Sequence, residues 1–456
     1  MPVFLPLTKE RFNEIPHEGD GVTTLNSHLI SALSAPIGTG DYRFLKESLF
    51  TYSRDAMLDF SPIPEQATSK NPIQVIDFFC GAGGTSLGFA AINRIAPSFR
   101  FLGGCDINAV SATTYSENFG TPIINEDILK IAETSVTIKQ FLARIHFDAS
   151  LPTILIGCAP CQGFSSHRKK HWNDADDERN NLVIAFSRIV SVVKPSVFIM
   201  ENVPEFLSER YWKYFSKAQS AFVKAGYTVK QCIYNAATFG VPQERFRSIV
   251  IGMKKEFLLP KGIYAPEEYK TVRNAISSLA PLAAGESDIS DPLHKAVAHK
   301  QSTIDIMRQV PHDGGSLPAG IGPECLSRVK GFYDVYGRLS WDKPSITITH
   351  YARNPASGRY THPEQNRGLT AREAARLQSF PDGFVFTGKS DDIYRQIGEA
   401  VPPLLSCGVA CDILVEYLSC EPTEDQLSSS VQSVPLPVNN SYSSVIASIK
   451  NTRRLG

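Results

Sequence analysis

Short apolar runs that alternate with helix-length segments constrain the fold of this chain more than any other feature. The runs cover residues 74–79, 101–105, 153–156, 197–200 and 248–251, and they are rich in β-branched and aromatic residues. Such runs, separated by helices, are typical of a parallel sheet that helices cover on both faces. We therefore predict an α/β fold.

The texture of the sequence divides the 456 residues into five parts. They are an N-terminal extension at 1–71, a large sheet domain at 72–271, a small loop-rich domain at 272–384, a return to the large domain at 385–420 and a tail at 421–456. The extension has helix-like stretches at 25–34 and 43–50, and its function is unknown. The tail is rich in Ser, Val and Asn, so we expect it to be disordered.

Charge and cysteine content exclude several classes of protein. Lys plus Arg and Asp plus Glu number 46 each, so the net charge of the chain does not favour binding to polyanions. The sequence still allows a local basic groove. No apolar run approaches the roughly 18 residues that span a bilayer. The start, MPVFLPLTKERF, lacks the basic and apolar regions of a secretory signal. Nine cysteines, an odd number, favour reduced thiols, and we expect a cytoplasmic protein without membrane contact.

A glycine-rich turn follows the first apolar run. In DFFCGAGGTSLGF, at 77–89, the glycines lead into a helix that begins near Thr85. Glycine lets the backbone approach a ligand closely, and a helix N-terminus favours polar or anionic groups. The spacing differs from the dinucleotide pattern G-x-G-x-x-G, which favours another adenosine-containing cofactor. A purely structural turn is the alternative.

Two acidic residues strengthen the cofactor interpretation. Asp106 ends the second run, where a carboxylate can accept hydrogen bonds from ribose hydroxyls. Asp127, in NEDI, follows about one βα unit later and could meet an adenine amino group. Each of the two could instead be a helix N-cap.

A C-x-x-C arrangement, Cys158 and Cys161, lies in LIGCAPCQGFS after the third run. A zinc site needs further ligands at similar spacing, which the sequence lacks. A thioredoxin-like dithiol needs a small βαβ domain around it. The third interpretation is a single nucleophile, Cys161, on a loop at the carboxyl edge of the sheet.

Glu201, in FIMENVPEF, is delivered by the fourth run to the same edge as Cys161. A carboxyl group half buried behind Phe198 and Met200 is expected to have a raised pKa, which suits a proton donor. Taken alone, the motif also fits a surface glutamate.

Three further polar residues alternate at strand period in ATFGVPQERFRSIVIG. They are Gln243, Arg245 and Arg247, and we expect them to point to one face. Two guanidinium groups beside a carboxylate and a thiolate suit a site for an anionic or carbonyl-bearing ring. Two surface salt bridges are the alternative.

Taken in order, these motifs resemble the cytosine-5 DNA methyltransferases. The series DFFCGAGG, Asp106, NEDI, APCQGFS, MENV and QERFR is completed by RGLTAREAARLQSFPD at 367–382 and QIGEAVPP at 396–403. The resemblance covers about 72–420 and extends to neither terminus.

The resemblance implies a Rossmann-like, S-adenosylmethionine-dependent methyltransferase domain with an inserted small target-recognition domain. The implied cofactor residues are Phe79, Gly81, Gly83, Asp106, Ile107, Asp127, Ile128, Glu399 and Val401. Cys161 matches the nucleophile, Glu201 the carboxyl group that contacts ring nitrogen 3 of cytosine, and Arg245, with Arg247, the support of base and thiolate. Implied DNA contacts are Gln162, Ser165, Arg168 and Gln243, and no metal is expected.

The implied reaction is methyl transfer to carbon 5 of a cytosine flipped out of double-stranded DNA, by a restriction–modification or solitary methylase of bacterial type. We expect a monomer, with a restriction endonuclease encoded nearby as a partner. Phosphate contacts would gather basic residues between the two domains and leave acids on the outer faces. The alternatives are a tRNA cytosine-5 methyltransferase and a DNA-binding regulator with a vestigial site.

Two positions depart from the family pattern. Cys158 stands where the family has a small or apolar residue, and we expect it to contribute only packing. Glu399 stands where Asn is common, and we expect it to cap a helix that starts near Pro402. A contact with the positively charged methionine portion of the cofactor is the alternative.

Overall fold

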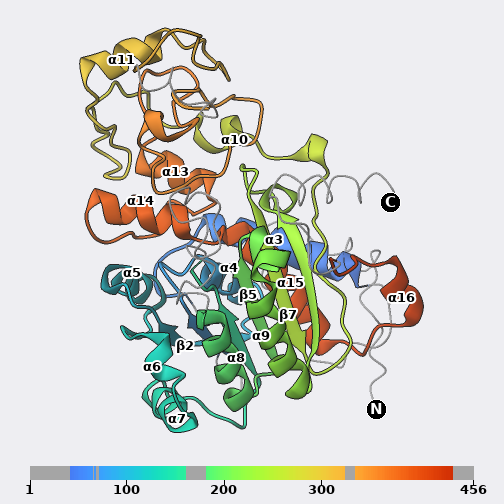
Figure 1. Ribbon diagram of the computed structural model, residues 1–456. Coiled ribbons are helices and arrows are strands. Elements are labelled where there is room, and N and C mark those ends of the chain that lie inside the picture. The colour runs from blue at the N-terminus through green and yellow to red at the C-terminus, as the bar shows by residue number, and fades with distance from the viewer. Residues whose placement is uncertain (1–41, 65, 68–70, 161–180, 324–333, 435–456) are drawn as a thin grey trace, which may run out of the picture. The chain divides into compact units, whose positions relative to one another are not determined.

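The computed structural model describes residues 42–64, 66–67, 71–160, 181–323 and 334–434 (Figure 1). The chain forms two compact units. The large unit comprises Met1–Tyr234, Phe246–Lys261 and Ser406–Gly456, and the small unit comprises Asn235–Arg245 and Gly262–Leu405. These limits differ from the expected boundaries at 272 and 384, because the small unit begins earlier, ends later and takes in 235–245.

A seven-stranded sheet in the order β3-β2-β1-β4-β5-β7-β6 forms the large unit. The strands are β1 (Ile73–Phe78), β2 (Phe99–Cys105), β3 (Ile123–Ile124), β4 (Thr153–Gly157), β5 (Val197–Asn202), β6 (Thr228–Asn235) and β7 (Phe246–Met253). All five predicted runs are strands. The prediction of an all-parallel sheet is wrong, because β7 runs antiparallel to β5. The sequence also missed β3, which has two residues, and β6, whose edge position tolerates polar side chains.

Helices cover both faces of this sheet (Figure 1). They are α3 (Arg43–Leu58), α4 (Gly84–Asn93), α5 (Ala109–Phe119), α6 (Ile128–Ile131), α7 (Ser135–Arg144), α8 (Asn181–Val193), α9 (Trp212–Lys224), α15 (Pro403–Leu418) and α16 (Glu424–Ser429), with the short 3₁₀ turns η3 (Pro204–Leu207) and η4 (Glu209–Tyr211) before α9. The helices α8 and α9 lie on one face, and α3, α4 and α15 lie on the other. The core under α6–α9 is rich in aromatic rings, such as Phe78 and Phe141, whose centroids are 5.1 Å apart.

The two ends of the described chain are more ordered than predicted. The helix α3 extends the expected stretch at 43–50 to Leu58, while the stretch at 25–34 lies outside the described residues. The tail, expected to be disordered from 421, contains α16, and Val434 then exchanges backbone and side-chain hydrogen bonds with Gln231 on β6. This contact covers part of the sheet edge.

The small unit is built from loops and short helices. Its helices are α10 (Val272–Ile276), α11 (Gln301–Arg308), α13 (Ala371–Leu377) and α14 (Ser390–Glu399), with the 3₁₀ turns η5 (Ala236–Phe239), η6 (Pro266–Glu268) and η7 (Pro355–Ser357). Buried polar groups organise the loops. The guanidinium of Arg367 pairs with Glu373 at 2.8 Å, and both side chains are 1% exposed.

One stretch in the described chain, Ser390–Leu418, is long and apolar enough to cross a membrane by length and composition. Its most apolar window is 83% buried inside the structure, and residues 400–402 divide it into α14 and α15. The stretch therefore has the character of buried core helices. The prediction that no apolar run approaches membrane length overlooked it.

Candidate active site

The glycine-rich turn joins β1 to α4 at the carboxyl edge of the sheet. Gly83 has φ +94° and directly precedes α4, and an added Cβ would lie 2.4 Å from the ring of Phe119. Phe79 also has a positive φ, +57°, which is costly for a residue with a side chain. The backbone is therefore held in a specific conformation at this edge.

Asp106 ties the end of β2 to this turn. One carboxylate oxygen accepts from the Gly81 N–H at 2.8 Å, and the other accepts from the Asn108 N–H at 2.7 Å. Asn108, and not Asp106, is the N-cap of α5. Burial raises the pKa of Asp106, although the two N–H groups oppose this shift. The cap alternative for Asp106 is therefore wrong.

The environment of the turn suits an adenosine-containing cofactor. A Cβ built on Gly81 would meet no atom of the described residues within 4 Å, so among them the space beside this backbone is open. Ile107, next to Asp106, exposes 73% of its surface and offers an apolar face for a ring. An open turn, a carboxylate and an exposed aliphatic side chain together fit the adenosine part of S-adenosylmethionine.

The other predicted adenine contacts have local structural roles. Asp127 is the N-cap of α6 and accepts from the Leu129 N–H at 2.9 Å, so the cap alternative holds for this residue. Ile128 is 4% exposed and belongs to the core under α6–α9. A cofactor contact by either residue stays a prediction.

Asp77 is a site residue that the sequence reasoning missed. It is fully buried beneath the turn, and the Ser86 hydroxyl donates to it at 2.7 Å, with the Tyr115 hydroxyl 2.9 Å from that of Ser86. Burial raises its pKa to about 7, the Ser86 hydrogen bond opposes this, and the charge of Asp106 adds to it. An acidic residue within an apolar strand was the available signal.

Cys158 directly follows β4, next to β1. Its Sγ lies 3.3 Å from the Thr85 hydroxyl in the first turn of α4. Burial, reinforced by the charge of Glu201, raises its pKa well above that of a free thiol, so the thiolate is disfavoured. The structure therefore supports a packing role. Cys161, Gln162, Ser165 and Arg168 lie outside the described residues.

Glu201 is the penultimate residue of β5 and forms an ion pair with Arg247 on β7. The Arg247 Nε lies 2.8 Å from a Glu201 oxygen, and the side chains are 13% and 12% exposed. The expected half-burial of Glu201 is confirmed, but its placement behind Phe198 and Met200 is wrong, because successive strand residues point to opposite faces and those two belong to the core under α6–α9. Arg247 is thus an ion-pair partner of this carboxylate.

Arg245 belongs to the small unit and is 2% exposed. Its guanidinium donates to the Ile348 carbonyl at 2.9 Å, and to the carbonyls of Gly398 and Ala400 at 3.1 and 3.0 Å. These contacts fix the turn that contains Glu399 and Val401. The role that the resemblance implies for Arg245 is a different one, direct support of the base and the thiolate. Support of a bound base stays a prediction.

Gln243 is fully buried in the same unit. Its amide donates to the Leu377 carbonyl and to Gln378, and its oxygen accepts from the Ile348 N–H at 2.8 Å. Gln243 and Arg245 thus meet at Ile348, whereas Arg247 contacts Glu201. Of the three residues only Arg247 lies within β7, so strand alternation does not relate it to the other two, and their common face stays a prediction. The complete burial of Gln243 gives no support to a contact with DNA.

Glu399 and Val401 lie at the junction of α14 and α15. Glu399 is the last residue of α14 and is exposed, and Val401 is 6% exposed. Because α15 begins at Pro403, Glu399 does not directly precede it. Glu399 is therefore not in the N-cap position of α15, contrary to the expected helix-capping role.

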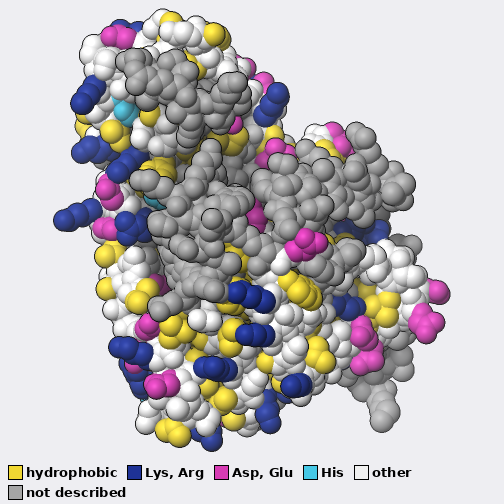
Figure 2. Space-filling model, in the orientation of Figure 1, with side chains coloured by type: hydrophobic (Ala, Val, Ile, Leu, Met, Phe, Trp, Pro, Cys, Tyr) yellow, Lys and Arg dark blue, Asp and Glu magenta, His cyan; other side chains and the backbone are white. Residues whose placement is uncertain are grey.

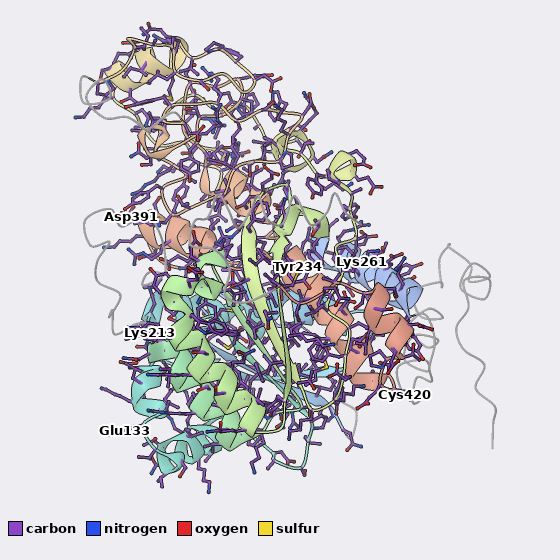
Figure 3. The ribbon with its side chains drawn as sticks, turned by 45° about the vertical axis from the view of Figure 1, so that its right-hand side comes forward. Glu133, Lys213, Tyr234, Lys261, Asp391 and Cys420 are labelled. Atoms are coloured by element: carbon purple, nitrogen blue, oxygen red, sulfur yellow. The ribbon has the colours of Figure 1, made fainter. Side chains whose placement is uncertain are left out.

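Basic residues line the outer face of the large unit over α8 and α9 (Figure 2). Neither helix contains an acidic residue, and Arg188, Lys213, Lys217 and Lys224 are exposed there. Lys213 is labelled in Figure 3. The expectation that outer faces carry mainly acids is therefore wrong for this face.

Four adjacent strand ends thus carry the candidate chemistry. In the order β2, β1, β4 and β5 they present Asp106, the glycine-rich turn, Cys158 on the segment leading to Cys161, and Glu201. Ligands of open α/β sheets bind at this carboxyl edge.

Comparisons with known proteins agree with this arrangement. The family model described as C-5 cytosine-specific DNA methylase matches residues 73–414. The chain is 37% identical over 342 residues to the Type II methyltransferase M1.HphI of Haemophilus parahaemolyticus, covering 74% of this chain and 86% of that protein. It is 32% identical over 351 residues to the Type II methylase M.HgiDII of Herpetosiphon aurantiacus, covering 74% and 94%.

A solved structure is similar as well. A putative DNA modification methyltransferase encoded within a prophage of E. coli superimposes with a TM-score of 0.58 at 25% sequence identity. The match covers 75% of this chain and 99% of that one. The family match starts after α3 and ends within α15.

Proposed function

Because the chain belongs to the C-5 cytosine-specific DNA methylase family, whose methyl donor is S-adenosylmethionine, we propose that it methylates carbon 5 of a flipped-out cytosine in a specific duplex sequence. The observation that carries this proposal is the shared edge of β2, β1, β4 and β5. There the open glycine turn follows β1 and Asp106 follows β2, while β5, separated from β1 by β4, bears Glu201, which is ion-paired to Arg247.

The chemistry requires a covalent step, because carbon 5 of cytosine is a poor nucleophile. The Cys161 thiolate adds to carbon 6 and forms a C–S bond, while Glu201 hydrogen-bonds or protonates ring nitrogen 3. When bound, S-adenosylmethionine would supply the methyl group to carbon 5, with its S–CH3 bond breaking and S-adenosylhomocysteine as the leaving group. Loss of the carbon 5 proton and of the Cys161 thiolate restores the aromatic ring. The target atoms are inaccessible within a stacked duplex, so the base must flip out.

Roles of the remaining residues follow from their positions. Phe79, Gly81, Gly83, Asp106 and Ile107 would hold the adenosine part of the cofactor, with Glu399 and Val401 as further contacts. Arg247 would orient the Glu201 carboxylate, and Arg245 would fix the turn of Glu399 and Val401. The small unit would recognise the target sequence, with Gln162, Ser165 and Arg168 contacting DNA.

A methyl-transfer assay on both DNA and tRNA distinguishes the proposed DNA methyltransferase from its nearest alternative, a tRNA methyltransferase. The purified chain is incubated with tritiated cofactor and either duplex plasmid DNA or total tRNA, and the DNA product is sequenced after bisulfite treatment. We expect label in DNA at one sequence context. Label in tRNA alone would overturn the DNA assignment, and sequence-specific DNA binding without transfer would indicate a regulator.

The Type II names of the similar proteins favour a restriction–modification role in the cytoplasm. In that case a restriction endonuclease of the same sequence specificity would be encoded nearby. Challenge of methylated and unmethylated plasmids with the neighbouring gene product tests this. Cleavage of only the unmethylated plasmid is expected, and a neighbourhood without such activity would favour a solitary methylase.

A further inference from the structure

The helix α3 lies outside the family match, yet it is packed into the large unit. Its inward face is buried, with Leu49 at 0%, Phe50 at 1% and Met57 at 2% exposure. Burial of that face accounts for the presence of the helix. It does not account for the polar contacts at both of its ends, which reach the elements beside the cofactor turn.

Lys46 ties the first part of α3 to α15. Its Nζ lies 2.7 Å from Glu416 and 3.0 Å from Asp412, and the three side chains are 13%, 4% and 10% exposed. Glu416 also accepts from the Leu258 N–H at 2.8 Å. Lys261 hydrogen-bonds through its backbone to Asp412 and, with Tyr234, is labelled in this region in Figure 3. A buried ammonium between two carboxylates resists displacement, because its loss leaves uncompensated charge.

The helix α15 in turn holds the start of α4. The Ser406 hydroxyl donates to the Thr85 carbonyl at 2.6 Å, in the first turn of α4. The two backbones also pass close together, since a Cβ on Gly88 would lie 2.4 Å from the Cys407 nitrogen. No side chain caps α4 at Gly83. The first turn of α4 therefore depends on α15 for its position.

Arg94 closes the set of contacts at the other end of α4. Its guanidinium donates to the carbonyls of Ala56 and Asp59, at the C-terminus of α3. Each pair among α3, α15 and α4 is thus joined by a polar contact: Lys46 joins α3 to α15, Ser406 joins α15 to α4, and Arg94 joins α4 to α3. The cofactor turn, residues 81–84, leads directly into α4.

We propose that α3 is a working part of the cofactor site, in which Lys46 and Arg94 are positioning residues that fix α4 and the 81–84 turn. This inference rests on the proposed use of S-adenosylmethionine at that turn. Displacement of α3 would let α4 shift and would misalign the Gly81 N–H with Asp106. Cofactor binding would weaken, while the chemistry at Cys161 and Glu201 would proceed once the cofactor is bound.

The test compares cofactor affinity, DNA affinity and turnover in full-length variants. Arg94→Ala changes an exposed side chain, so we expect it to fold, and Lys46→Met keeps the aliphatic stem but removes the charge. We expect the cofactor Kd to rise about fivefold for Arg94→Ala and at least tenfold for Lys46→Met. Turnover at saturating cofactor and the Kd for DNA should stay within twofold of wild type.

Two controls separate positioning from general stability. Arg54→Met removes an ion pair with Asp55 on the same helix and should leave the cofactor Kd unchanged. Lys46→Arg retains the charge and should restore most of the affinity. If Lys46→Met fails to fold, Arg94→Ala carries the test alone.

The contrary results are distinct. A folded Arg94→Ala with wild-type cofactor Kd would overturn the inference. So would a parallel loss of cofactor binding, DNA binding and turnover, because that pattern indicates instability. Failure of the wild-type chain itself to bind S-adenosylmethionine would instead reject the proposed function.

Discussion

Arg247 holds Glu201 in an ion pair across the antiparallel strands β5 and β7, with 2.8 Å between the Arg247 Nε and the carboxylate. Residue 201 is opposite Ile249 in the register, so Arg247 is its diagonal neighbour two positions earlier on β7. Strand geometry therefore sets this contact. The carboxylate is oriented before any base arrives, which is the arrangement that a positioned acid requires.

Substitution of Glu201 by Gln should reduce turnover by roughly 100-fold or more, in line with general acid–base contributions. The amide can still donate a hydrogen bond, but it cannot deliver a proton. The measurement is single-turnover methyl transfer with tritiated cofactor. Glu205→Gln is the control, because Glu205 is half-buried and feels the charge of Arg247 but lies beyond the strand end. Near-normal turnover in Glu201→Gln would give this carboxylate a purely structural role.

Cys161→Ser should abolish methyl transfer and leave the cofactor Kd within a few-fold, because a hydroxyl has too high a pKa to add to cytosine. Cys158→Ala is the matched comparison and should stay active. Its thiol is half-buried against Thr85, and desolvation raises its pKa. Activity in Cys161→Ser would refute the nucleophile, and loss of turnover in a folded Cys158→Ala would support a dithiol.

The sequence predicted the strands well, because each apolar run is buried on both sides, as in β4 with all of its residues buried. It did not predict the direction of β7, since the apolar run at 248–251 reads the same in either direction. Support of the reacting base by Arg245 is implied by the resemblance and stays a prediction, but the sequence did not reveal what holds the guanidinium in place. The guanidinium partners of that residue, Ile348, Gly398 and Ala400, are more than a hundred positions away, and local periodicity carries no information about them.

Asp77 should make the stability of the large unit fall as pH rises from about 4 to about 7. Its pKa is raised by burial to about 7 in the folded chain, above the unfolded value near 3.9. The folded state therefore binds the proton more tightly, and its advantage is lost on deprotonation. The full effect is on the order of a few kcal/mol. Denaturant unfolding across this pH range measures it.

Asp77→Asn should remove that pH dependence, because the amide does not titrate. Asp148→Asn is a control of opposite sign, since hydrogen bonds from Ser150 lower the pKa of the exposed Asp148. An unchanged slope of unfolding free energy against pH in Asp77→Asn would show that Asp77 does not titrate in this range.

Glu399→Asn should leave the Michaelis constant of the cofactor within about threefold. The carboxylate ends α14, where the helix dipole disfavours a negative charge, so Asn is also expected to be neutral or slightly stabilising. Steady-state kinetics with varied cofactor measures the constant. A tenfold rise, about 1.4 kcal/mol, would show that Glu399 is a direct ligand of the cofactor.

Arg338→Lys should destabilise the small unit by about 2 to 4 kcal/mol, because two or more buried acceptors lose their donor. Arg338 is fully buried, and its guanidinium donates to four backbone carbonyls and to the Asn366 side chain. Lysine has three donors on a single nitrogen and cannot reach acceptors on several sides at once.

The matched control for Arg338→Lys is Arg273→Lys, since Arg273 forms an exposed ion pair with Asp342. Exposed ion pairs contribute little to stability because solvent screens them, so this variant should unfold close to wild type. Thermal unfolding and limited proteolysis of both variants measure the difference. Equal stability of the two would mean that the loops of the small unit are held by its short helices and apolar contacts. A loss of stability in Arg338→Lys but not in Arg273→Lys would show that one buried guanidinium holds the loops of the small unit together, where few strands are present.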